Sequence, residues 1–210
     1  MQLQIKKPIK AHDYLIAERT SAMKNEYFDG EILAMAGASP KHNKISTNMI
    51  RVLANQLLET PCSIYASDIK VKIQEFDRYV YPDILIVCGN DEYADENNDV
   101  LLNPTVIIEI LSDSTEAYDR GDKFKNYQLI CSLREYILVS QYQCYVEKFS
   151  WQEDNTWIYS KYDKLEDVIN IESIPCELPV FEIYRKVNFS AYRIKRNRLI
   201  LTKRTLPSKL

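Results

Sequence analysis

Histidine and glycine are scarce in this 210-residue sequence, and their scarcity excludes several classes of enzyme. The chain has only His12 and His42, so no HExxH zinc motif can form, and a serine triad would lack an accompanying GxSxG motif. His42 could contact a phosphate or cap a site, but a lone histidine is more often structural, and we favour that role here. The four glycines form neither a Walker A loop nor a GxGxxG fingerprint. These gaps argue against zinc hydrolases, nucleotide-loop enzymes and Rossmann cofactor enzymes.

The sequence also lacks a long apolar run and any close pair of cysteines. No stretch reaches the roughly 18 apolar residues that span a bilayer, and residues 1–10 lack the apolar middle of a secretion signal. We therefore expect a cytoplasmic protein with no membrane partner. No CxxC motif occurs, so reduced thiols are favoured over disulfides or zinc ligation. The five cysteines are Cys62, Cys88, Cys131, Cys144 and Cys176.

Length and charge predict one folded domain followed by a basic tail. With 46% hydrophobic and 27% charged residues, the chain has material for one α/β domain, expected over residues 1–185. Residues 183–210 hold nine Lys or Arg and no acid, so the net charge of −3 divides into +9 there and −12 in residues 1–182. The tail, residues 186–210, is either a phosphate-binding element or a solvated terminus, and the sequence favours neither.

Hydrophobic periodicity predicts alternating strands and helices. Ser39 and Pro40 are typical of the N-cap and first residue of the longest helix. A polar turn at 75–78 joins two strands into an expected hairpin. We predict strands over 27–36, 63–74, 79–88, 105–111, 135–140, 144–150 and 156–162, and helices over 10–20, 40–59 and 119–131, with one more helix before the tail.

Two carboxylates interrupt otherwise apolar strands in the middle of the chain. Asp83 lies in YPDILIV, in phase with Leu85 and Val87, and Glu109 lies in TVIIEIL. A buried carboxylate is costly unless a cation meets it. For one acid alone, an Arg or Lys partner is the simpler explanation. For two acids on neighbouring strands, a shared hard cation such as Mg²⁺ is favoured.

A lysine in the following helix is the third candidate. On a helical wheel of DRGDKFKNYQLIC, Lys123 borders the apolar face and Lys125 faces water. An amine beside two carboxylates can orient an attacking water, help to deprotonate it and offset charge on a phosphoryl transition state. An ion pair with Asp83 or Glu109 is the structural alternative, and it is compatible with catalysis because a catalytic lysine is also paired at rest.

Five segments together resemble the signature of the Uma2 family, which belongs to the PD-(D/E)XK nuclease-like superfamily. They are YFDGEI at 27–32, AGASP at 36–40 with His42, YPD at 81–83, EILS at 109–112 followed by Ser114 and Thr115, and DRGDKF at 119–124. The resemblance covers roughly residues 10–185. It implies an α/β, restriction-endonuclease-like fold, in which a mixed β-sheet is flanked by helices. The superfamily's usual lysine position is Leu111 here, and the family is thought to recruit a lysine from the next helix, which matches Lys123.

The same resemblance implies a site and a reaction. Asp83 and Glu109 would bind the metal, with Ile110 as a further metal-contacting residue, and Lys123 would assist catalysis. Glu31 would be a third inward-facing carboxylate, although a salt bridge at the strand edge explains it nearly as well. The implied cofactor is Mg²⁺ or Mn²⁺, and the implied reaction is hydrolysis of phosphodiester bonds in DNA by an endonuclease. A homodimer follows by analogy, since cutting both strands needs two sites. The alternative is a catalytically inactive nucleic-acid-binding or regulatory protein on the same fold.

Overall fold

The main sheet of the protein has six strands in the order β11-β10-β9-β8-β6-β3. The computed structural model describes residues 8–189. Within this sheet β8 and β9 run parallel, and every other neighbouring pair is antiparallel. The strands are β3 (Cys62–Ala66), β6 (Ile84–Cys88), β8 (Val106–Leu111), β9 (Glu135–Ser140), β10 (Val146–Trp151) and β11 (Trp157–Tyr162).

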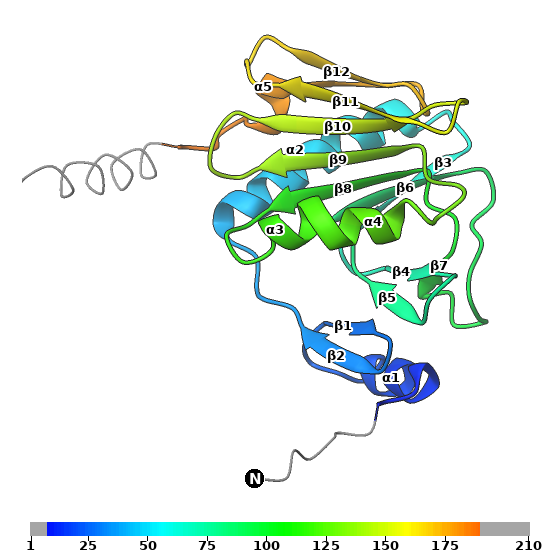
Figure 1. Ribbon diagram of the computed structural model, residues 1–210. Helices are drawn as coiled ribbons and strands as arrows, with labels where there is room; N and C mark the ends of the chain where they lie inside the picture. Colours follow the sequence, from blue (N-terminus) through cyan, green and yellow to red (C-terminus); the bar gives the residue numbers. More distant parts are fainter. Residues whose placement is uncertain (1–7, 190–210) are drawn as a thin grey trace, which may run out of the picture.

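The long helix α2 (Pro40–Leu57) covers one face of this sheet and lies behind it in Figure 1. Ser39 caps the helix by accepting a hydrogen bond from the His42 N–H at 3.1 Å, and Pro40 occupies its first turn. The buried residues of α2 recur every four positions and pack on the sheet. They are Ile45, Met49, Leu53 and Leu57. The same core includes α5 (Val180–Ile183) and the hairpin of β12 (Val168–Ile171) and β13 (Cys176–Pro179).

A shorter helical segment covers the opposite face, in front of the sheet in Figure 1. It consists of α3 (Glu116–Tyr118), a π-helical turn η1 (Asp119–Lys123) and α4 (Phe124–Tyr127). In β8, Ile108 and Ile110 belong to the core beneath α2, whereas Ile107 and Leu111 belong to the core beneath α4. Because side chains alternate along a strand, Glu109 points to the α4 side.

A second sheet of five strands, in the order β2-β1-β5-β4-β7, lies beneath the first in Figure 1. Its strands are β1 (Asn25–Phe28), β2 (Glu31–Ala34), β4 (Lys70–Ile73), β5 (Arg78–Val80) and β7 (Val100–Leu101). Helix α1 (Ala11–Glu18) packs on it through Tyr14, whose ring stacks on Tyr27 at a centroid distance of 4.9 Å. We call α1, β1 and β2 the N-terminal lobe.

Several predicted strands are divided in the structure. The strand expected over 27–36 is the hairpin β1–β2, which turns at Asp29 and Gly30 with φ of +48° and +105°. The strands expected over 63–74 and 79–88 each split between the two sheets. The second one breaks at Pro82, which has no N–H to donate to a ladder. The hairpin β12–β13 was not predicted.

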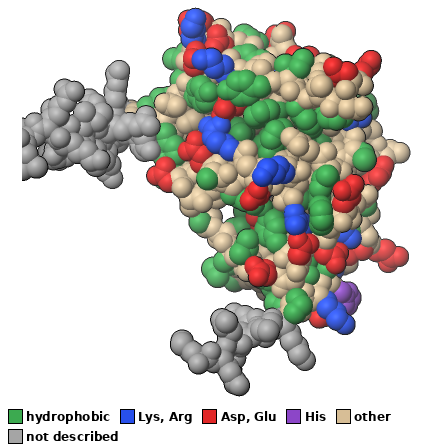
Figure 2. Space-filling model, in the orientation of Figure 1, with side chains coloured by type: hydrophobic (Ala, Val, Ile, Leu, Met, Phe, Trp, Pro, Cys, Tyr) green, Lys and Arg blue, Asp and Glu red, His purple; other side chains and the backbone are tan. Residues whose placement is uncertain are grey.

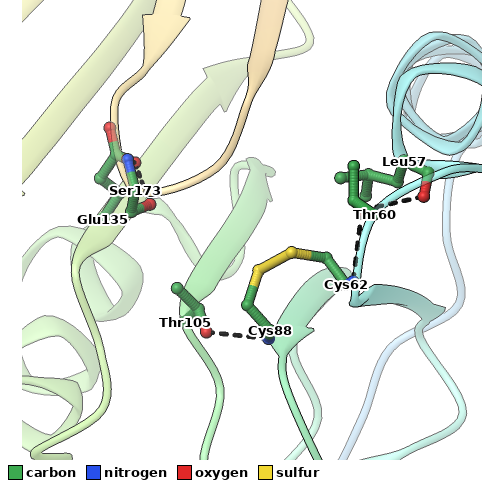
Figure 3. The surroundings of a disulfide bond; sticks show 7 residues. All are labelled: Leu57, Thr60, Cys62, Cys88, Thr105, Glu135 and Ser173. Carbon is green, nitrogen blue, oxygen red and sulfur yellow. Dashed lines mark hydrogen bonds between the residues drawn. A yellow bond between two sulfur atoms is a disulfide. The ribbon is translucent and has the colours of Figure 1, made fainter.

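The prediction of reduced thiols is wrong for one pair of cysteines. Cys62 on the edge strand β3 lies directly opposite Cys88 on β6, and the two form a disulfide with their Cα atoms 4.0 Å apart (Figure 3). The two cysteines are 26 residues apart in sequence, so their spacing did not predict a disulfide; only the strand register brings them together. Cys131, Cys144 and Cys176 are free.

The basic tail falls almost wholly outside the described residues, which end at residue 189. The division into a domain over 1–185 and a tail over 186–210 therefore stays a prediction. Within residues 8–189, every helix is too short or too polar to span a membrane.

Candidate active site

Residues from both sheets line a cleft of about 840 Å³, and the predicted site residues meet in it. The cleft wall includes Asp83, Glu109 and Lys123, together with the start of α2 and the segment that joins β2 to α2. Figure 1 shows this segment crossing between the N-terminal lobe and the rest of the described domain, which we call the main body. The cleft therefore opens where the two sheets meet.

Asp83 lies just before β6, where Pro82 has ended the previous strand. One carboxylate oxygen, Oδ2, accepts a hydrogen bond from the Ile110 N–H at 2.7 Å and lies 3.0 Å from His42 Nε2. The other oxygen, Oδ1, has no hydrogen-bond partner within residues 8–189. The side chain is 18% exposed, so one oxygen is fixed by the protein and the other remains available to a ligand in the cleft.

Glu109 lies in the middle of β8 and is 3% exposed. Its Oε1 accepts a hydrogen bond from the Tyr127 hydroxyl at 3.0 Å and lies 2.9 Å from Lys123 Nζ. Its Oε2 accepts a hydrogen bond from the Asp83 N–H at 3.3 Å. The two acids are therefore held side by side. Glu109 accepts from the main chain of Asp83, and Asp83 accepts from the main chain of Ile110, the residue after Glu109.

Lys123 ends the π-helical turn and is 4% exposed. Its amine lies 2.9 Å from Glu109, 3.3 Å from Glu26 and 3.7 Å from Asp119. Lys125, two residues further on, has a side chain that is 75% exposed. The structure thus places Lys123, predicted to border the apolar face, beside the acids, and Lys125 in solvent. A π-turn inside a helix is often found at functional sites.

Burial and crowding of acids set the charges of this cluster. Burial raises the pKa of Glu109 well above its usual range, and the charges of Asp119 and Asp83 add to that effect while Lys123 opposes it. Burial likewise raises the pKa of Asp119. Burial alone would lower the pKa of Lys123, but the surrounding acids, Glu109 first, outweigh it and raise the pKa well above the ordinary value. The lysine is therefore charged at neutral pH, and the acids outnumber it.

Glu31 does not belong to this cluster. It lies on β2, all four residues of which are exposed, so the prediction of an inward-facing carboxylate is wrong. The third acid is Glu26 on β1, which is 7% exposed and accepts hydrogen bonds from the Tyr81 N–H at 3.1 Å as well as contacting Lys123. The Asp-Gly pair at 29–30 is a strong sign of a two-residue hairpin turn. A turn predicted there would have divided the expected strand into β1 and β2, which carry Glu26 and Glu31 respectively.

His42 and Ile110 both reach the site. His42 stands on the first turn of α2 with its Nε2 on Asp83, and its Nδ1 is buried without a hydrogen-bond partner in the described chain. With Asp83 ionised, Nε2 is the protonated nitrogen, so the histidine donates to the acid. Ile110 contributes its N–H to Asp83 and lines the cleft. The sequence favoured a structural histidine over one that contacts a phosphate or caps the site, and it did not predict the contact with Asp83.

The donor set fits a hard divalent cation. Asp83 and Glu109 present carboxylates from neighbouring strands, and the oxygen that Ile110 can offer is its main-chain carbonyl. Within residues 8–189 no group of three or more His, Cys, Asp or Glu side chains is arranged to hold a metal. Two carboxylates suffice for Mg²⁺, which commonly keeps several water ligands. A dication would also offset the negative charge that Lys123 alone leaves uncompensated.

The mixed sheet with helices on both faces and acids at its centre defines a restriction-endonuclease-like fold. A crystal structure described as a putative nuclease belonging to DUF820, from Anabaena variabilis ATCC 29413, matches the chain with a TM-score of 0.66. The match covers 87% of this chain and 98% of that one at 18% identity. The predicted fold class is confirmed.

Sequence comparison gives the family. The model of the Uma2 family, described as "Putative restriction endonuclease", matches residues 11–180. Two proteins of Synechocystis sp., both described as uncharacterized, are similar to the chain. The protein slr1290 is 34% identical over 181 residues, which cover 86% of this chain and 94% of the relative. The protein sll1609 is 32% identical over 155 residues, covering 74% and 88%. The chain belongs to the Uma2 family.

Proposed function

We propose that this protein is a metal-dependent endonuclease that hydrolyses phosphodiester bonds in DNA. The observation that carries the proposal is the convergence of Asp83, Glu109 and Lys123 in one cleft from three separate elements. The description of the family as a restriction endonuclease supports the same reaction.

Each residue has a role that follows from its surroundings. Asp83 and Glu109 would hold Mg²⁺ or Mn²⁺, and the main-chain carbonyl of Ile110 would be a further ligand. Such an ion, when bound, supplies a water molecule of lowered pKa and offsets charge on the phosphate. Lys123, whose pKa the surrounding acids raise, donates hydrogen bonds and stabilises negative charge that develops on the phosphoryl oxygens.

Glu26 is a positioning residue in this scheme. It holds the Lys123 amine from the side of the second sheet and accepts a hydrogen bond from the Tyr81 N–H, two residues before Asp83. The same carboxylate therefore fixes the approach of both the amine and one metal ligand.

Closed circular DNA tests the proposal, because it offers no ends to an exonuclease. Supercoiled plasmid and circular single-stranded DNA are incubated with Mg²⁺ or Mn²⁺ and with wild type, Asp83→Ala or Asp122→Ala. We expect wild type to open the circles, Asp83→Ala to lose this activity by at least about 100-fold, and Asp122→Ala to retain it. Asp122 is a fair control because its side chain is 78% exposed and lies outside the cleft. Binding without cleavage by wild type would show a nucleic-acid-binding protein in place of a nuclease.

A further inference from the structure

One part of the cleft lining is apolar, although the buried acids line the same cleft, and we call this part the apolar wall. The wall consists of Met23, which is 67% exposed, and the continuous segment 33–38, in which Leu33 is 49% exposed. No residue of that segment has a polar side chain. In Figure 2, hydrophobic side chains border the hollow between the main body and the N-terminal lobe, where this segment crosses. Exposed apolar surface inside a cleft is typical of a binding site.

The cleft lining also carries hydroxyl groups. Ser112, Ser114 and Thr115 form a turn in which the Ser112 hydroxyl lies 3.0 Å from each of the other two, and all three line the cleft. Hydroxyl groups donate hydrogen bonds to phosphate oxygens without adding charge. We call this turn the hydroxyl rim.

The charges of the cleft disfavour a double helix. Five acids line it, namely Glu26, Asp83, Glu109, Asp113 and Asp119, against the two amines of Lys24 and Lys123. Both amines are already paired, Lys24 with Asp68 and Lys123 with the buried acids. A duplex carries two phosphate strands, one charge per roughly 1.7 Å of axis, and keeps its base faces stacked inside. A single strand carries half that charge and exposes base faces to apolar side chains.

We propose that the cleft binds an unpaired DNA strand, with its bases against the apolar wall and its phosphates along the hydroxyl rim. The inference rests on the proposed function, and it names the substrate class of the same site. The buried acids line the same cleft as both surfaces, so a strand bound there brings its backbone near them.

Equilibrium binding tests the inference without requiring cleavage. A fluorescent single-stranded oligonucleotide, its blunt duplex and the same strand with abasic sites are titrated with the full chain in Ca²⁺. We expect the single strand to bind at least about tenfold more tightly than the duplex, and the abasic strand to bind about fivefold more weakly than the intact one.

Two variants of one strand give the matched comparison. Leu33→Ser should weaken binding of the intact strand about fivefold and leave binding of the abasic strand unchanged, since that strand has no bases to lose. Ile32→Ser, also on β2, should change neither, because Ile32 is 38% exposed but does not line the cleft.

The outcomes separate the two proposals. Equal affinity for single strand and duplex, or a Leu33→Ser effect that is the same on the abasic strand, overturns the inference while cleavage of circular DNA still supports the nuclease. A clear single-strand preference without any cleavage supports the inference and overturns the nuclease. Binding of none of the three oligonucleotides overturns both.

Discussion

Replacing Lys123 with methionine tests the buried ion cluster directly, because methionine keeps much of the side chain and removes its charge. The amine contacts Glu109, Glu26 and Asp119, and each of these acids is at most 7% exposed. Removing one partner of a buried ion pair costs about 3–5 kcal/mol. We expect Lys123→Met to lose that much of its free energy of unfolding at pH 7, a large share of the roughly 5–15 kcal/mol of an ordinary domain.

Urea unfolding followed by circular dichroism, in the presence of EDTA, measures this loss. Lys125→Met is the matched control, since that amine is exposed and pairs with exposed Asp122, and surface pairs contribute only about 0–1 kcal/mol. Adding Glu109→Gln to Lys123→Met should recover part of the loss, because a neutral amide no longer needs the cation and still accepts from Tyr127. A Lys123→Met protein within about 1 kcal/mol of wild type, with an unchanged m value, would refute the buried cluster.

Three further perturbations address other parts of the structure. His42→Ala should weaken Mn²⁺ binding about 10–100-fold by calorimetry, and His42→Gln less, because an amide can still donate to Asp83, the proposed metal ligand. Equal affinities would show that this contact does not affect metal binding. Replacing Cys62 and Cys88 with serine should lower unfolding free energy by about 3 kcal/mol, and thiol titration of the unfolded, unreduced wild type should give three free thiols; five would exclude the disulfide. Hydrogen bonds from Arg19 outweigh burial and lower the pKa of Asp99 to about 2, below its unfolded value of about 3.9. Asp99 therefore stabilises the fold above pH 4, and this stabilisation is lost as the pH falls to 2. Asp99→Asn should therefore cost about 2 kcal/mol at pH 7 and almost nothing at pH 2 in urea titrations, and a cost independent of pH would contradict this account.

The parts of the site that depend on local periodicity were predictable from sequence. Alternation along a strand fixed Glu109 on the face of Ile107 and Leu111. Asp83, expected inside an apolar strand, lies just before β6, because Pro82 interrupts the chain there. The helical wheel separated the buried Lys123 from the exposed Lys125, even though part of that segment is a π-turn.

The parts of the site and fold that depend on turns and strand register were not predictable from sequence. The place of Glu26 in the site depends on the reversal of the chain at Asp29 and Gly30, because this turn puts β1 and β2 in different environments. The Cys62–Cys88 bond depends on which residues of β3 and β6 lie opposite each other, a long-range fact that spacing alone does not contain. The contact of His42 with Asp83 likewise needs a helix and a strand to dock.

Glu26 comes from the N-terminal lobe, whereas the residues that it completes come from the main body. The buried amine therefore has its full set of counter-charges only after the two halves of the molecule have assembled. A chain emerging from the ribosome that has formed one half alone carries an incomplete centre. The arrangement makes assembly of the whole domain a precondition for a complete charge cluster around Lys123.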